Sequence, residues 1–445
     1  MINLKRLSTN QLITFFLLKL EPFMIGICLF SGMFLDFPGP LLKLLKVGSY
    51  LILFFLILWR WKRFAYVFTR DIPLLCLVGT AVWSVGWSAV PGIPELLRAV
   101  LRATALGAYL AVRYNPKEQM RLVAWVLGIV AILSLLVTLG HGIGDAPAQG
   151  IFRHKNHLAR LMTLNAIISL LSVLNHRKYR WVGWVGFSLS ILMLLLSQGK
   201  SALLIFLVMI TLLPLHKFVK QHYKLQTVLY MVSALLAFVA SIVILVNLEF
   251  ILVDILGKDL QLNGRLPIWT LVFDKILERP WLGYGFEGFW SSDAGYSVIN
   301  STWLAHRGYG NAHSGYLELA VQLGFLGVFL FVLSLLIALF KTIQLLSVSK
   351  KIEFFWMFLY LVFFSIVNLS LDPSILAEDI VWTLYVSTAL SAAVYQSRIV
   401  KNRHLLGFRE QEVGSREHRS QNRKEVRGKK SFVPDCYEKP CKLFQ

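Results

Sequence analysis

Residues 316–340 read YLELAVQLGFLGVFLFVLSLLIALF, an apolar run whose one charged side chain is Glu318. A helix needs about 20 predominantly apolar residues to cross the hydrocarbon core of a bilayer, so this run predicts a membrane-spanning helix. The rest of the chain repeats the pattern and predicts an all-α, polytopic membrane protein of about 12 transmembrane helices. The other apolar runs lie near residues 22–38, 42–59, 72–89, 95–113, 121–140, 157–175, 181–197, 201–216, 225–248, 354–371 and 379–396.

The composition favours the same interpretation. Of 445 residues, 56% are hydrophobic and 16% are charged, whereas soluble domains carry about 25% charged residues. This excludes a single soluble domain, a disordered chain and a nucleic-acid-binding protein, although the formal net charge is +21. Few charges with a positive excess are typical of multi-span proteins with basic cytoplasmic loops.

The positive charges lie in alternate loops between the predicted spans. Because basic loops stay in the cytoplasm, this alternation predicts that both termini are cytoplasmic. The chain then divides into residues 1–249 with nine spans, a long outer loop at 250–315, three spans in 316–397, and a basic, disordered cytoplasmic tail at 398–445. The basic loops are residues 60–70, 113–121, 177–180, 217–224 and 341–351, and the loops at 90–95 and 371–379 lie between them.

Two segments predict local features of the outer side. The stretch Leu266–Leu277 places Leu266, Trp269, Val272, Phe273 and Ile276 on one helix face, which predicts an amphipathic helix on or in the outer surface. The short runs 181–197 and 201–216 are separated by three residues. They form either a tight hairpin or one broken helix, and the sequence leaves both open.

Cationic and hydrogen-bonding residues gather on this outer side, where the charge rule predicts few. They predict an electropositive site for an anion such as pyrophosphate, because Arg and Lys donors match its oxygens. Any single one of them could instead be an interfacial side chain that snorkels to the membrane surface. The residues are Arg153, His154, Lys155, Asn156, Lys200, Arg265, His313 and Ser314.

Three arginines fall within predicted spans. Arg98 and Arg102 are four residues apart and share a helix face, and Arg160 lies near the start of the 157–175 run. Buried cations are costly and face a partner or a watery cavity. These arginines therefore either pair, for example with Glu95, or line a cleft and contact substrate.

Two other patterns resemble cofactor or metal motifs, but we do not interpret either of them as such a site. Residues 283–288 match G-x-G-x-x-G, but they lie between membrane spans rather than in a βαβ unit, so we interpret them as a tight turn. Cys436 and Cys441, with His404 and His418, fit no common zinc spacing. We therefore expect neither a metal nor a cofactor.

Three of these stretches together resemble the O-antigen ligase and exopolysaccharide polymerase superfamily. FRHKNHL at 152–158 resembles the HKN segment of exopolysaccharide members. The second stretch is Gly264-Arg265 with Trp269, followed by RPWLGYGF at residues 279–286. His313-Ser314, nine residues and Gly324-x-x-Gly327 fit the ligase pattern. Val328-Phe329 replaces the threonine pair of ligases, and this departure, with the HKN segment, favours a polymerase-type member.

The resemblance covers about residues 150–340 and implies a metal-independent, GT-C-like glycosyltransferase of the bacterial inner membrane. Its donor would be an undecaprenyl-pyrophosphate-linked glycan on the periplasmic side. Its acceptor would be a sugar hydroxyl, on another lipid-linked repeat for a polymerase or on lipid A-core for a ligase. A flippase and a chain-length regulator are candidate partners. His313 matches the family's essential histidine and Arg265 its essential loop arginine, while Lys200 matches more loosely.

The residue types agree with this chemistry. Fixed cations stabilise the negative charge that develops on a departing pyrophosphate, and histidine can activate a hydroxyl near neutral pH. Our hypothesis is that His313 activates the acceptor while Arg265, with Lys200, Arg153 or Lys155, holds the pyrophosphate. The alternatives are an inorganic-anion transporter lined by the buried arginines and a scaffold in polysaccharide export. The long outer loop favours the transferase, because a carrier has no need of it.

Overall fold

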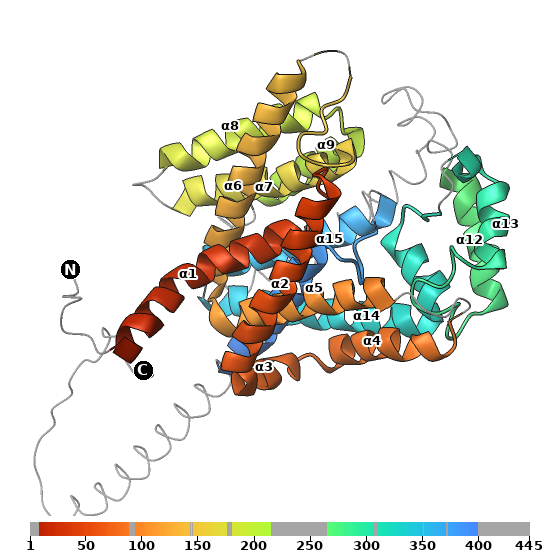
Figure 1. Cartoon of the computed structure of the whole chain (residues 1–445), viewed down its shortest axis with the longest axis horizontal. Helices are drawn as coiled ribbons and strands as arrows, with labels where there is room; N and C mark the ends of the chain where they lie inside the picture. The colour runs from red at the N-terminus through yellow and green to blue at the C-terminus, as the bar shows by residue number, and fades with distance from the viewer. Residues whose placement is uncertain are drawn as a thin grey trace, which may run out of the picture. The chain divides into compact units, whose positions relative to one another are not determined.

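The computed structural model describes residues 9–88, 94–142, 144, 146–175, 180–214, 265–306, 310–349, 351–370 and 373–398. In these ranges it is built of helices and contains no β-strand, which confirms the all-α prediction (Figure 1). Met1–Gln396 forms one compact unit. The predicted span 225–248, the basic loop 217–224, the loop residues 250–264, the four candidate zinc ligands and the tail from 399 lie outside the described residues.

Thirteen labelled helices run through the described parts of the chain (Figure 1). A further helix covers residues 380–398, and single 3₁₀ turns cover Ser84–Gly86 and Trp303–His306. The labelled helices are α1 (Thr9–Ser31), α2 (Gly39–Trp59), α3 (Trp61–Phe68), α4 (Ile72–Trp83), α5 (Pro94–Arg113), α6 (Pro116–His141), α7 (Lys155–Asn175), α8 (Arg180–Leu196), α9 (Lys200–Leu212), α12 (Arg265–Glu278), α13 (Asp293–Asn300), α14 (Gly315–Ser349) and α15 (Ile352–Ser370).

Five of the described helices are long and apolar enough to cross a membrane: α2, α6, α7, α14 and α15. A sixth span results if α3 and α4, bent by 99° at their break, count as one. The multi-span prediction therefore holds, but the described residues do not reach twelve spans. The reasons are physical, because α8 and α9 have only 17 and 13 residues and α5 carries several charged side chains.

Contacts between loops follow the predicted alternation. The Asp36 amide donates to the Ile151 carbonyl at 2.8 Å and the Arg153 amide to the Phe34 carbonyl at 3.2 Å, so the outer end of the span predicted at 22–38 meets the predicted outer loop before residue 157. Glu21 of α1 pairs with Arg60 and Arg113 at 3.4 and 3.0 Å, so two predicted cytoplasmic loops also meet. Loops on one side of a membrane can meet in this way; which side is the cytoplasm stays a prediction.

The helix predicted at 266–277 is present as α12, and only part of its predicted apolar face is buried in the protein. Ile268, Val272 and Ile276 are buried against α13 and α14, which lie beside α12 (Figure 1). Leu266 and Phe273, which the sequence placed on the same face as Val272 and Ile276, are about half exposed. The helix has apolar residues on two sides, and periodicity alone cannot tell which side meets the protein.

The G-x-G-x-x-G stretch fills a break in α14, which confirms its interpretation as a tight turn. Gly324 has φ 64° and ψ −165°, a conformation that interrupts the helix. The amides of Tyr284 and Gly285 donate to the carbonyls of Val321 and Gln322, both at 2.9 Å. Gly283 has φ 62°, and a Cβ there would lie 2.6 Å from the Gln322 carbonyl group. The second and third sequence stretches are therefore in direct backbone contact.

Candidate functional site

His313 lies in the short segment between residue 310 and the start of α14. Its φ is 52°, in the left-handed region that non-glycine residues rarely occupy. Its amide donates to Asn311 Oδ1 at 2.6 Å, and its ring stacks on Trp303 with 5.9 Å between the centroids. Such a conformation costs of order 1–3 kcal/mol and persists only where the surrounding structure imposes it.

Glu318, on the first turn of α14, holds this segment in place. Its Oε2 accepts a hydrogen bond from the Ala312 amide at 3.1 Å. Its Oε1 accepts from Trp290 Nε1 at 2.7 Å and from Gln322 Nε2 at 2.9 Å. The carbonyl of Ala312 accepts from Trp269 Nε1 at 2.8 Å. Both polar groups of the residue before His313 are therefore fixed, one by α14 and the other by α12.

Arg265 reaches the same place through α12. It is the first residue of α12 and lies one helical turn before Trp269. The indole of Trp269 is the group that holds the Ala312 carbonyl. The two residues predicted to be catalytic, Arg265 and His313, are thus carried by segments that are hydrogen-bonded to each other.

Glu287 is a second carboxyl group near this segment. It follows the tight turn, has φ 55°, and its amide donates to Gln322 Oε1 at 3.2 Å. Burial and, second, the negative charge of Glu318 raise the pKa of the Glu287 carboxyl from its ordinary 4.5 to about 7. At neutral pH this group therefore exchanges between its protonated and ionised forms.

Ser314 connects the His313 segment with α7. Its hydroxyl donates to the Asn368 carbonyl at 3.4 Å. The Asn368 side-chain oxygen accepts from the Ser374 amide at 2.7 Å, and the Ser374 hydroxyl accepts from Arg160 Nη1 at 2.9 Å. This chain of hydrogen bonds joins the third sequence stretch to the helix that begins within the first.

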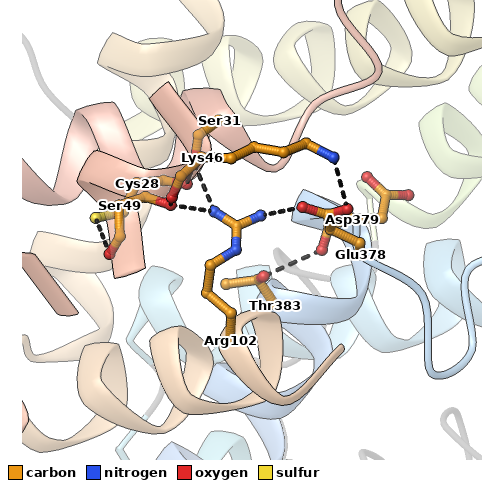
Figure 2. Close-up of polar contacts among 8 residues, drawn as sticks. All are labelled: Cys28, Ser31, Lys46, Ser49, Arg102, Glu378, Asp379 and Thr383. Atoms are coloured by element: carbon orange, nitrogen blue, oxygen red, sulfur yellow. Dashed lines mark hydrogen bonds and ion pairs between the residues drawn. The ribbon is translucent and has the colours of Figure 1, made fainter. Parts of the chain in front are cut away.

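The buried arginines are paired with carboxylates. Arg160 Nη2 lies 2.8 Å from Asp379 Oδ2, and both side chains are 1% exposed. Arg102 Nη2 lies 2.7 Å from Glu378 Oε1, and its Nη1 donates to Ser31 and Ser49 (Figure 2). Arg102 therefore pairs with Glu378 rather than with Glu95, the partner suggested from the sequence. We call Arg102, Arg160, Glu378 and Asp379 the arginine–carboxylate cluster.

The remaining predicted cations lie before or at the start of α7, at the start of α9 and on α5. Arg153 is exposed and its Nε donates to the Leu35 carbonyl at 3.2 Å. The other side chains are partly buried or exposed, and Arg98 lies one turn before Arg102 on α5. Lys155 begins α7, and the Asn156 amide donates to His154 Nδ1 at 3.2 Å. Lys200 begins α9. It follows Gly199, where an added Cβ would lie 2.6 Å from the Cβ of Ala159 on α7.

A comparison with known families gives a match over part of the chain. Residues 185–332 match the family model described as O-antigen ligase. The matched region runs from α8 into α14 and contains Arg265, the tight turn and His313. No curated protein matches the chain.

Residues 185–332 are therefore similar to O-antigen ligases, and the long apolar helices among the described residues fit a membrane protein. The match covers part of the chain and agrees with the resemblance that the sequence stretches indicated.

Sequence reasoning missed Glu287, Glu318 and Gln322. A signal existed for Glu318, because it is the one charged residue of the 316–340 run and charges within spans mark functional or paired sites. Glu287 lies inside the G-x-G-x-x-G stretch, whose glycines indicate a tight turn and give no signal for the residue between them. Glu378 and Asp379 could not be matched to their arginines before the chain was folded.

Proposed function

We propose that this protein is a polymerase-type glycosyltransferase that extends a glycan carried on undecaprenyl pyrophosphate. The acceptor is a sugar hydroxyl of another lipid-linked repeat, and transfer takes place on the periplasmic face of the inner membrane. The observation that carries the proposal is the double anchoring of Ala312 by Trp269 and Glu318. It supports a single site in which Arg265 and His313 act together.

The proposed reaction displaces a pyrophosphate from an anomeric carbon. His313 takes the proton of the acceptor hydroxyl, whose oxygen then forms the new bond to that carbon. The bond from the carbon to the pyrophosphate oxygen breaks, and its electron pair leaves with the lipid pyrophosphate. Arg265 stabilises the charge that develops there, with Lys200, Arg153 and Lys155 as further candidates. His154, Asn156, Ser314 and Arg98 remain candidates for substrate contact.

We assign Arg102 and Arg160 to the framework of the site. Their guanidinium groups are hydrogen-bonded to carboxylates and serines, so less of their charge is available to an anion. The same observation counts against an anion transporter, because that alternative used these arginines to line a path. The proposal also includes twelve spans, a GT-C-like fold and cytoplasmic termini, with a flippase and a chain-length regulator as partners.

A deletion strain complemented with single variants tests the proposal. His313→Ala and Arg265→Ala should abolish chain extension while the amount of protein in the membrane stays normal. His141→Ala and Arg63→Ala are matched controls, because both residues are exposed and lie outside the site. Normal polymer from either site variant would overturn the assignment.

A ligase that joins glycan to lipid A-core is the second candidate, favoured by the ligase-type spacing from His313 to Gly324 and Gly327. The two activities share one site chemistry and differ in the acceptor. Glycan analysis of the deletion strain separates them. Loss of extracellular polymer with intact lipopolysaccharide favours the polymerase. Long lipid-linked polymer that never reaches lipid A-core favours the ligase.

A further inference from the structure

Two left-handed backbone conformations occur in the candidate site, at Glu287 and His313. Among the described residues, four non-glycine residues have positive φ: Gln198, Glu287, His313 and Leu376. Each costs free energy that ordinary loop residues avoid, and such outliers concentrate where a side chain must be aimed at a ligand. His313 has a proposed role, whereas Glu287 has none so far.

Glu287 and His313 are held by one pair of side chains on α14. Glu318 and Gln322 are four residues apart, so they face the same side of the helix. Gln322 Oε1 accepts from the Glu287 amide at 3.2 Å, while Gln322 Nε2 donates to Glu318 at 2.9 Å. Glu318 in turn accepts from the Ala312 amide at 3.1 Å. A continuous hydrogen-bonded path therefore fixes both left-handed residues relative to the same helix turn.

The charge of this pair indicates which substrate it faces. The hydrogen bonds to Glu318 come from an indole, an amide side chain and a backbone amide, all of them neutral donors. Two neighbouring carboxyl groups repel a pyrophosphate when they are ionised, and a pyrophosphate needs cations. Carboxylates are instead strong hydrogen-bond acceptors for hydroxyl or ammonium groups. The cations predicted to hold pyrophosphate begin other elements, namely α7, α9 and α12.

We propose that Glu287 binds the acceptor sugar by accepting a hydrogen bond from one of its hydroxyl or amino groups, beside His313. Glu318 and Gln322 are positioning residues that keep Glu287 and His313 at a fixed spacing. The inference rests on the proposed function and sharpens it: the acceptor residue at this position is a neutral or amino sugar, and an acidic sugar is rejected because its carboxylate would face two others.

The test uses the full-length protein in lipid nanodiscs, with lipid-linked repeats extracted from the deletion strain as donor. The varied acceptor is the same repeat released from its lipid, which can accept but cannot donate. Glu287→Gln should raise the KM for this acceptor about tenfold or more, the effect of losing one charged hydrogen bond, and leave kcat within about threefold. Glu353→Gln, on the first turn of α15, is the matched control and should change neither constant.

A second measurement needs no variant. The released repeat is oxidised so that its primary hydroxyls become carboxylates, and the wild-type protein should accept it at least about tenfold less well. Glu287→Gln should reduce that discrimination. Equal use of both acceptors by the wild type, or an unchanged KM in Glu287→Gln, would overturn the inference. A fall in kcat with KM unchanged would overturn acceptor binding too.

The proposed function and the acceptor role of Glu287 can be contradicted independently. If His313→Ala and Arg265→Ala are inactive while Glu287→Gln behaves as wild type, the acceptor role of Glu287 is wrong and the proposed function stands. If His313→Ala or Arg265→Ala transfers glycan normally, the proposed function itself is wrong.

Discussion

The arginine–carboxylate cluster and the segment around His313 both place ionisable side chains at buried or half-buried positions, but they balance charge in opposite ways. In the cluster each guanidinium has a carboxylate within 2.8 Å. Around His313 the carboxylate of Glu318 is surrounded by neutral donors, and two residues adopt left-handed backbone conformations. A charged residue at membrane depth is thus not evidence of a substrate site by itself, because a paired charge can serve the framework.

The largest expected effect on stability comes from removing one partner of a buried ion pair. Asp379→Asn leaves the Arg160 guanidinium buried without its counter-charge, which should cost about 3–5 kcal/mol of unfolding free energy. Thermal unfolding of the purified protein in detergent measures the effect. Lys46→Met is the control, because Lys46 is 48% exposed and its pair with Glu378 should contribute at most about 1 kcal/mol.

Removing both charges sharpens this test. Arg160→Met combined with Asp379→Leu leaves no uncompensated charge, so most of the lost stability should return. A double variant as unstable as Asp379→Asn would contradict the interpretation that the pair is held together by charge.

The second-largest effect concerns activity. Glu318→Ala removes three hydrogen-bond acceptor contacts and releases the Ala312 amide, so His313 should lose its fixed position. We expect the transfer rate to fall about 100-fold, the size of effect produced by misplacing a catalytic group by about 1 Å. Initial rates in nanodiscs measure this. A rate within threefold of the wild type would show that Glu318 does not position the segment.

Glycine substitutions test the break in α14. Gly324→Ala forces a side chain into the left-handed region and against the backbone of Trp281, which should cost about 1–3 kcal/mol. Gly128→Ala is a matched control within α6, because nothing lies within 4 Å of the added Cβ and alanine favours a helix. Thermal unfolding should show opposite signs for the two variants; equal shifts would argue against a required kink.

The smallest expected effect is on pH-dependent stability. The pKa of Glu287 is raised in the folded protein, so folding favours its protonated form and stability falls as pH rises from about 4.5 to about 7. Glu287→Gln should remove this loss and be more stable than the wild type above pH 7 by about 1–2 kcal/mol, discounted because the side chain is partly exposed. Below pH 4.5 the difference should vanish.

The groups that titrate near Glu287 set the control for that experiment. Glu318 faces it from α14, and His313 lies on the segment that Glu318 holds. Thermal unfolding of Glu287→Gln from about pH 4 to about pH 8, on both sides of the shifted pKa, separates the contribution of Glu287 from those of Glu318 and His313. A pH profile parallel to that of the wild type would assign the loss to those neighbours.

The sequence allowed the fold class, the helix at α12 and the tight turn to be predicted, because apolar runs and glycine patterns act locally. The number of spans and the buried face of α12 could not be predicted in the same way. Leu266 and Phe273 are as apolar as Ile268 and Val272, and only packing against α14 decides which pair is buried.

The residues of the candidate site also differ in whether the sequence alone could predict them. Arg265, His313 and Ser314 could be selected because their spacing resembles a known family. The partner of Arg102 is Glu378, 276 residues further along the chain, and no local pattern connects them. Glu287 and Gln322 also gain their meaning only through folding, since the break at Gly324 is what brings the tight turn against α14.

The central claim is that His313 belongs to the transfer site while the buried arginines support it. The rate of glycan transfer by His313→Ala in nanodiscs, normalised to folded protein, tests this most directly. Loss of a positioned proton acceptor predicts a rate lower by about 100-fold to 10,000-fold with the unfolding temperature close to that of the wild type. A rate within about threefold of the wild type would contradict the account.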